Sequence, residues 1–366
     1  MRKSAVLLIF FLIFVLTLPF AGQSSGSNAS SPGTTILTSD YKFSPEASQL
    51  SKVRRQIIES YQSAPDNSFV LLDRSSDTKR KPVRLVKISD SSLRKKLSAR
   101  SAIVMDASSG KEIYSHNPDR PGQPASTIKV LTSLLAMDYL KNNALVPVSS
   151  WAASMPRSKI YIRKGRTYYA DDMINAVLMA SANDASVALA EKIAGSESGF
   201  AKMMTRKANE LGAKKTICKT ASGLTAKGQQ TTARDLATIF RAAMQHQEFA
   251  GRIKLLKAKT SYGKTLRSHN KALWQIDGAQ GGKTGYTWAA KQTYVGKFSR
   301  NGEEIVVAIL GSRNMWNDIA KLVEYGFSKQ LQLAGRENNR TKTHDPAPAP
   351  HSDFVVLTGN KKTERL

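Results

Sequence analysis

Residues 292–310, QTYVGKFSRNGEEIVVAIL, carry the clearest structural signal in the chain. Two runs rich in apolar and β-branched residues, Gln292 to Phe298 and Glu304 to Leu310, flank Arg300-Asn301-Gly302. An Asn-Gly pair between two such runs is the strongest short-range signal for a β-hairpin, because both central turn positions need a positive φ. The sequence therefore predicts two adjacent antiparallel strands near the end of the chain.

A second pair of strands is predicted almost 200 residues earlier. Ala102 to Met105 is a short apolar run, Glu112 to Tyr114 is its expected partner, and Ser108-Ser109-Gly110 supplies the turn. Helices are predicted between and after the strand pairs, where apolar residues recur at helical spacing. They cover residues 127–139, 171–179, 185–193, 200–211, 234–245 and 315–333. We therefore predict an α+β fold, with an antiparallel sheet flanked by helices and an inserted, mostly helical lobe.

The first candidate motif is Ser-x-x-Lys at Ser126 and Lys129. A nucleophilic hydroxyl needs a nearby amine to take its proton, and positions i and i+3 of a helix share a face. Seven Ser-x-x-Lys matches occur in this chain, but only this one opens a convincing amphipathic helix. Pro124 just upstream is typical of a helix start. Ser126 is therefore the candidate nucleophile.

Two further motifs follow in order along the chain. Ser181-Ala182-Asn183 lies at a break between two helical patterns, where side chains can project into a cleft; on its own it would be interpreted as helix capping. Lys283-Thr284-Gly285 lies in an expected strand, and its glycine would allow a substrate backbone to approach closely. On its own this tripeptide would be interpreted as a turn. Together the three motifs are far more specific than any one of them.

The set of motifs resembles the penicillin-binding proteins and serine β-lactamases, and in particular the low-molecular-mass D-alanyl-D-alanine carboxypeptidases. The resemblance runs from about Ser101 to Gln330. It is carried by the strings Ala125-Ser126-Thr127-Ile128-Lys129, Ser181-Ala182-Asn183-Asp184-Ala185, Ala221-Ser222-Gly223-Leu224, Thr231-Thr232-Ala233-Arg234-Asp235 and Lys283-Thr284-Gly285-Tyr286-Thr287. It implies a DD-peptidase or β-lactamase-like fold and a penicillin-sensitive carboxypeptidase acting on peptidoglycan stem peptides, with β-lactam antibiotics as covalent inhibitors.

The resemblance also implies a role for each residue of the three motifs. Ser126 would be acylated and Lys129 would be its base, while Ser181 would pass a proton to the leaving amine. Asn183 would hold a substrate amide, and Lys283 and Thr284 would bind the substrate carboxylate. Gly285 and Tyr286 would complete the substrate-binding edge, with the backbone N–H groups of Ser126 and Tyr286 as the oxyanion hole. Burial and the like charge of Lys283 should lower the pKa of Lys129 from about 10.4.

Charge and the amino-terminal residues bear on the compartment. The chain has 55 basic and 28 acidic residues, a net charge of +27, which favours anionic partners: nucleic acid, anionic cell-wall polymers or a membrane surface. Arg2 and Lys3 precede an apolar run from Ala5 to Phe20, the layout of an export signal, which argues against nucleic acid. We expect an exported protein, periplasmic or otherwise extracytoplasmic. An uncleaved N-terminus that anchors it to the membrane is the alternative.

The predicted domains follow from these boundaries. We expect a signal peptide or anchor at residues 1–22, a basic and partly disordered linker or stalk at 23–100, the catalytic domain at 101–333, and a disordered polar tail at 334–366. From Lys52 to Arg100 there are 13 basic and 5 acidic residues. The stalk is either a solvated spacer or a contact with anionic polymer.

Several alternatives stay open. Only a short polar tail follows the last predicted helix, whereas many carboxypeptidases of this kind have a second β-rich domain and a C-terminal anchor. An endopeptidase that cuts D-Ala–meso-diaminopimelate cross-links is therefore one alternative, and a non-catalytic cell-wall-binding protein is another. A class A β-lactamase fits poorly, because the chain lacks a Glu-x-x-Leu-Asn-like loop around Glu210. One cysteine, Cys218, and histidines without ligand spacing predict no metal or other cofactor.

Overall fold

The computed structural model of the protein describes residues 89–342. The predicted signal or anchor at 1–22, most of the predicted linker and the end of the predicted tail lie outside these residues. None of the described helices is both long enough and apolar enough to cross a membrane.

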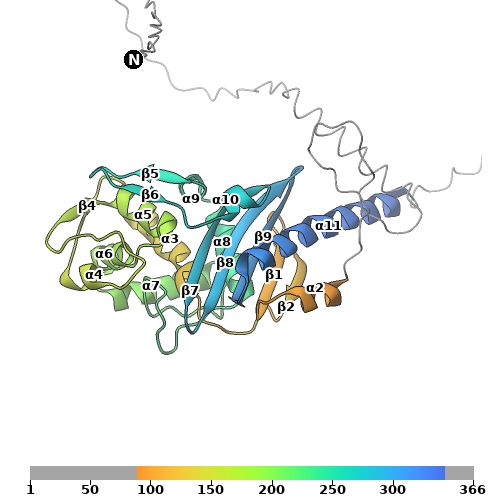
Figure 1. Cartoon of the computed structure of the whole chain (residues 1–366), viewed down its shortest axis with the longest axis horizontal. Helices are drawn as coiled ribbons and strands as arrows, with labels where there is room; N and C mark the ends of the chain where they lie inside the picture. Colours follow the sequence, from red (N-terminus) through yellow and green to blue (C-terminus); the bar gives the residue numbers. More distant parts are fainter. Residues whose placement is uncertain (1–88, 343–366) are drawn as a thin grey trace, which may run out of the picture. The chain divides into compact units, whose positions relative to one another are not determined.

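A five-stranded antiparallel sheet forms the centre of the fold (Figure 1), with strand order β2-β1-β9-β8-β7. The strands are β1 (Ser101–Asp106), β2 (Glu112–His116), β7 (Ala279–Thr287), β8 (Lys291–Arg300) and β9 (Glu303–Ser312). The predicted hairpin is β8–β9, and its turn residues Asn301 and Gly302 have φ of 52° and 83°. Strand β1 pairs with β9, with Ala102 opposite Ile309, so both ends of the domain meet in one sheet. The predicted α+β fold is confirmed.

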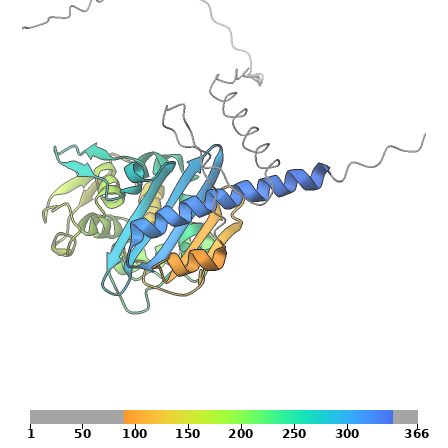
Figure 2. The same cartoon turned by 45° about the vertical axis from the view of Figure 1, so that its right-hand side comes forward.

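Helices cover both faces of this sheet. On one face lie α11 (Met315–Lys342), which crosses the strands in Figure 2, and α2 (Asp90–Lys96). Val104 of β1, Ile309 of β9 and Ile319 of α11 share one buried apolar cluster on that face. On the other face, α8 (Ala233–Ala243) packs against β1, β8 and β9. Each face of the sheet has its own buried apolar cluster. Both clusters receive side chains from the same strands, because successive residues of a strand point to opposite faces.

The helical lobe lies beside β7, on the side away from the rest of the sheet (Figure 1). It is built from the 3₁₀ turn η1 (Ala125–Ile128) and from α3 (Lys129–Tyr139), α4 (Ser150–Ser154), α5 (Ala170–Met179), α6 (Asn183–Ala194), α7 (Glu197–Glu210) and α9 (Gln247–Ile253). Helix α3 runs through its centre, with all residues from Lys129 to Ala136 buried. The helices at α3, α5, α6, α7 and α8 confirm the predicted ones within a few residues.

Several short elements of the fold have no counterpart in the sequence prediction. They are α4, α9, α10 (Ala272–Gln275) and the two hairpins β3–β4 (Leu145–Pro147 with Thr167–Tyr169) and β5–β6 (Lys257–Lys259 with Thr265–Arg267). Each of their strands has three residues. A run of that length is too short to show an alternating pattern.

The folded part extends past both predicted boundaries of the catalytic domain. Helix α2 lies inside the segment expected as linker, yet Leu93 is only 1% exposed and packs in the cluster under α11. Ser98 Oγ donates a hydrogen bond of 2.7 Å to Asp318 of α11. Helix α11 continues beyond Leu333 to Lys342. Only two leucines, Leu93 and Leu97, stand among the charged residues of this segment. They were too few for a periodic signal, so the predicted domain began at Ser101 and did not include α2.

Candidate active site

Ser126 lies in the turn η1, directly before α3. The preceding residue, Ala125, has φ of +50°, a left-handed conformation that costs about 1–2 kcal/mol for a residue with a Cβ. Residues three apart eclipse one another in a 3₁₀ turn. The Nζ atom of Lys129 consequently lies 2.9 Å from Ser126 Oγ. The structure thus brings together the first two predicted residues.

Lys129 is enclosed completely, with no exposed surface. Its amine contacts two oxygens besides Ser126 Oγ: Asn183 Oδ1 at 2.7 Å and the backbone carbonyl oxygen of Ser222 at 2.6 Å. Burial, followed by the positive charge of Lys283, holds the pKa of Lys129 well below its ordinary value of 10.5. The amine is therefore disposed to be neutral.

The identity of these partners decides what a neutral Lys129 can do. A neutral amine has two hydrogens and one lone pair. The oxygens of Asn183 and Ser222 only accept hydrogen bonds, so they take the two hydrogens. The lone pair is then left for the hydroxyl proton of Ser126, which is the arrangement of a serine nucleophile with an amine base.

A second serine–lysine pair faces the first. Ser181 lies between α5 and α6 with φ of +57°, and its Oγ accepts a hydrogen bond of 2.8 Å from Lys283 Nζ. Lys283 also donates to the carbonyl oxygen of Thr284, at 3.0 Å. This lysine is 1% exposed, and burial lowers its pKa to about 7. Near neutral pH, Lys283 is therefore present in both its charged and its neutral form.

Asn183, the first residue of α6, contacts the first pair through Lys129. Its Oδ1 accepts from Lys129, and its Nδ2 donates to the carbonyl oxygen of Pro156 at 3.0 Å. Its backbone N–H donates to Ser158 at 2.7 Å. Within the described residues Nδ2 makes this single hydrogen bond. Orientation of Lys129 is a contribution of Asn183 that the sequence did not indicate.

The predicted substrate edge is the end of β7. Thr284 is half-buried beside Lys283, and Tyr286 is 56% exposed at the rim. A Cβ atom added to Gly285 would lie 2.8 Å from the backbone nitrogen of Ser126. The sequence predicts that this glycine allows a substrate to approach β7 closely. In the structure it also allows β7 to pack against η1.

Two residues of the site were not predicted in their roles. Ser222 acts through its backbone carbonyl, which no side-chain pattern can indicate. Gly223 has φ of +77°, and a Cβ there would overlap the carbonyl group of Ala125. The string Ala221-Ser222-Gly223-Leu224 had been noted for its resemblance, and this signal could have pointed to the loop.

Comparisons with known proteins agree with this geometry. Residues 86–314 match the Peptidase S11 family, described as D-alanyl-D-alanine carboxypeptidase. The chain is 31% identical over 274 residues to the D-alanyl-D-alanine carboxypeptidase DacF of Bacillus subtilis, covering 71% of this chain and 70% of the relative. It is 34% identical over 247 residues to DacB2 of Mycobacterium tuberculosis, covering 64% and 84%.

Solved structures show the same fold. A D-alanyl-D-alanine carboxypeptidase from Mycobacterium tuberculosis superposes with a TM-score of 0.61 at 33% identity, over 63% of this chain and 91% of that one. Penicillin-binding protein D2 from Listeria monocytogenes, in its ampicillin-bound form, superposes with a TM-score of 0.58 at 28% identity, over 63% and 98%. Fold and family define a serine peptidase. The chain belongs to the D-alanyl-D-alanine carboxypeptidase family, as its motifs predicted.

Proposed function

We propose that the protein is a serine carboxypeptidase that removes the terminal D-alanine from peptidoglycan stem peptides. The observation that carries the proposal is the buried amine of Lys129, which lies 2.9 Å from Ser126 Oγ with two acceptor-only oxygens as its other contacts. Family membership supports the substrate class, and the geometry supports the role proposed for each residue.

Acylation follows from the two serine–lysine pairs. Ser126 Oγ attacks the carbonyl carbon of the penultimate D-alanine while Lys129 takes the hydroxyl proton. The carbon–nitrogen bond then breaks, and the leaving D-alanine takes a proton through Ser181, which contacts Lys283. Water next attacks the ester on Ser126, which releases the shortened peptide and restores the hydroxyl group.

Substrate binding is assigned to the end of β7 and to Asn183. The charged form of Lys283 and the hydroxyl of Thr284 would bind the terminal carboxylate. The free hydrogen of Asn183 Nδ2 would hold a backbone carbonyl of the peptide. The N–H groups of Ser126 and Tyr286 would stabilise the negative oxygen that develops during attack.

A penicillin would acylate Ser126 by the same steps, because its strained amide presents a carbonyl and a neighbouring carboxylate to the same groups. The Listeria relative bound to ampicillin supports this part of the proposal. We place the protein outside the cytoplasm, with the basic segment before Ser89 near anionic wall polymers. The amino-terminal apolar run supports that location.

Muropeptide analysis tests the proposal. Purified protein is incubated with un-cross-linked pentapeptide muropeptides and with cross-linked dimers, and the products are weighed by mass spectrometry. We expect loss of one alanine from the pentapeptides, with dimers left intact. Conversion of dimers to monomers would instead identify an endopeptidase, and unchanged muropeptides would contradict both.

A further inference from the structure

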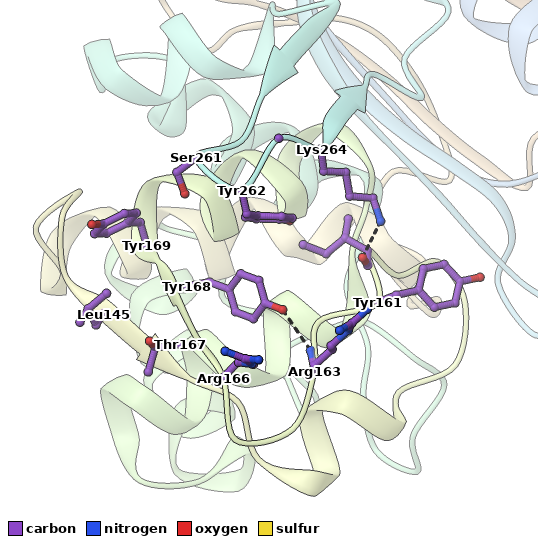
Figure 3. Close-up of a pocket in the computed structure, with 12 residues that line it drawn as sticks. Leu145, Tyr161, Arg163, Arg166, Thr167, Tyr168, Tyr169, Ser261, Tyr262 and Lys264 are labelled. Carbon is purple, nitrogen blue, oxygen red and sulfur yellow. Dashed lines mark hydrogen bonds between the residues drawn. The ribbon is translucent and has the colours of Figure 1, made fainter.

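A cavity of about 900 Å³ lies in the helical lobe, and neither Ser126 nor any other predicted site residue lines it. Figure 3 shows its two walls. One wall is the segment from Ile160 to Tyr169, which ends in β4, and the other is the turn of the β5–β6 hairpin, Ser261 to Lys264. This volume is in the range of ordinary small-molecule sites.

Two buried carboxylates hold the walls in place. Asp184, which is fully buried, accepts hydrogen bonds from the backbone N–H groups of Ile160 (3.1 Å) and Ile162 (3.2 Å). Asp172, which is 4% exposed, accepts from the backbone N–H of Ser261 at 3.1 Å. Lys264 Nζ ties the walls together by donating to the carbonyl oxygen of Ile160 at 2.6 Å (Figure 3). The cavity is thus a fixed feature of the fold.

The lining of the cavity is cationic. Residues 157–166 contain five basic side chains and residues 254–267 contain five more, and neither stretch contains an acidic one. Arg163 and Arg166 line the cavity and are exposed. Among the described residues neither arginine has a carboxylate partner within 4 Å. Their guanidinium groups therefore remain available to an anionic ligand.

The lining is also aromatic and rich in hydroxyl groups. Tyr168 and Tyr262 meet edge to face, with ring centroids 5.0 Å apart, and Tyr161 and Tyr169 lie at opposite ends (Figure 3). Thr167 and Ser261 add two further hydroxyls. Tyrosine rings present a flat apolar face and a polar tip, which suits the mixed C–H and O–H surface of a sugar. The lining has none of the side-chain amides that read nucleobase edges.

One wall of the cavity continues into the catalytic site. The residues just before Ile160 contact Asn183, since Pro156 accepts from its side chain and Ser158 from its backbone. A chain-like ligand in the cavity would therefore lie next to the peptide that Ser126 attacks.

We propose that this cavity binds a saccharide that carries carboxylate or phosphate groups, as a second site beside the catalytic one. Arg163 and Arg166 pair with the anionic groups, and the tyrosine rings pack against the sugar. Binding in this cavity does not depend on the proposed peptidase activity. It can be measured without turnover. It would hold the enzyme on a glycan while Ser126 acts on a neighbouring peptide.

The test uses the full chain and four probes in calorimetric titrations. They are an oligogalacturonate with carboxylate charges, a phosphorylated maltodextrin, a neutral maltodextrin, and an oligodeoxythymidylate matched in charge. The test variant is Arg163→Ala with Arg166→Ala. Its control is Lys164→Ala with Lys254→Ala, which removes the same charge from exposed lysines of the same stretches that do not line the cavity.

We expect one or both anionic saccharides to bind, and the double arginine variant to bind at least about tenfold more weakly. The lysine control should change affinity by less than about threefold, and turnover of a small D-Ala-D-Ala peptide should stay the same in both. The two anionic saccharides distinguish a carboxylate source from a phosphate source. Tyr169→Ala should also weaken binding, whereas Tyr139→Ala, exposed but outside the cavity, should not.

Three results would overturn the proposal. The first is equal weakening in the arginine variant and the lysine control, which would mean attraction by net charge. The second is an absence of binding by any saccharide. The third is tighter binding of the oligonucleotide than of either saccharide, which would assign the cavity to nucleic acid. Each of these binding results can still be obtained if the protein does not cleave muropeptides.

Discussion

The amine of Lys129 lies 2.9 Å from the hydroxyl oxygen of Ser126, and two acceptor-only oxygens occupy the rest of its hydrogen-bonding capacity. The three oxygens come from η1, from α6 and from the loop that contains Ser222. The proposed catalysis by Ser126 would therefore depend on groups that are far apart in the sequence, and each can be tested separately.

Removal of the nucleophile is the first test. Ser126→Ala should abolish covalent labelling by a fluorescent penicillin and leave the thermal unfolding temperature nearly unchanged, because only one hydroxyl is lost. Ser108→Ala is the matched control, since Ser108 begins another Ser-x-x-Lys match but is exposed at a turn. Persistent labelling of the Ser126 variant would assign the acylated residue elsewhere.

The second test concerns the base. Lys129→Arg keeps the positive charge but cannot lose a proton near neutral pH. Acylation should fall at least about 100-fold, within the range of general base catalysis. Lys129→Met, neutral and of similar length, should lose as much, which separates the loss of the base from strain caused by arginine. Stopped-flow acylation and circular dichroism measure rate and fold. Near-normal acylation in the methionine variant would point to another base.

The local parts of this site could be predicted from the sequence, and the distant contacts could not. Ser126 and Lys129 are three residues apart, and Asn301-Gly302 determines its own turn, so nearby residues suffice for both. Lys283 meets Ser181 across 102 residues of sequence. Their order along the chain predicted a shared site only through resemblance to a family. The distances required the folded chain.

Some features gave no sequence signal for a physical reason. The carbonyl oxygen of Ser222 is a backbone group that every residue has. The strands of the β5–β6 hairpin are too short for a period-2 pattern, yet its turn forms one wall of the saccharide cavity. Helix α2 packs on the sheet through one buried residue, Leu93. Such elements are stabilised by tertiary packing rather than by their own pattern.

The pH dependence follows from Lys283, whose pKa burial lowers to about 7. Above this pH the amine loses its proton, and with it the charge that we propose binds the substrate carboxylate. The value of kcat/KM for a D-Ala-D-Ala peptide should therefore decline above pH 7, by up to about tenfold per pH unit. Burial and the charges of Lys283 and Lys129 lower the pKa of His269 below its ordinary value of 6.5. Its titration therefore lies on the acid side of the predicted decline.

A peptide ester without the terminal carboxylate is the control for this profile. It gains nothing from the charge of Lys283, so its kcat/KM should lack the declining limb. Steady-state rates from pH 5 to 9 measure both profiles. The same decline for both substrates would show that the limb belongs to another group.

The close packing behind the nucleophile predicts a specific glycine effect. Gly223 and Gly228 both have φ of +77°, so alanine costs each of them the same backbone strain, about 1–2 kcal/mol. Only at Gly223 would a Cβ overlap the carbonyl of Ala125; at Gly228 it meets a flexible lysine at 3.5 Å. Gly223→Ala should lower the free energy of unfolding by at least about 2 kcal/mol more than Gly228→Ala. Urea denaturation measures the difference, and equal losses would contradict the packing argument.

The last prediction concerns the basic segment before the described residues. Residues 52–88 carry nine basic and four acidic side chains, and anionic wall polymer is the expected partner. A protein that begins at Ser89 should bind isolated cell-wall sacculi more weakly at low salt than the full chain does. The difference should vanish at high salt, since such attraction is screened over about 8 Å at 0.15 M. Turnover of a small D-Ala-D-Ala peptide should not change.

Two comparisons separate charge from length and from folding. A full-length variant with the nine basic residues changed to glutamine should bind sacculi as weakly as the shortened protein, whereas full retention would show that the segment is only a spacer. A protein that begins at Ser101 should lose turnover as well, because the cut removes Leu93 from the core and Ser98 from its hydrogen bond to Asp318. If that protein were as active and as stable as the one that begins at Ser89, α2 would not belong to the catalytic domain.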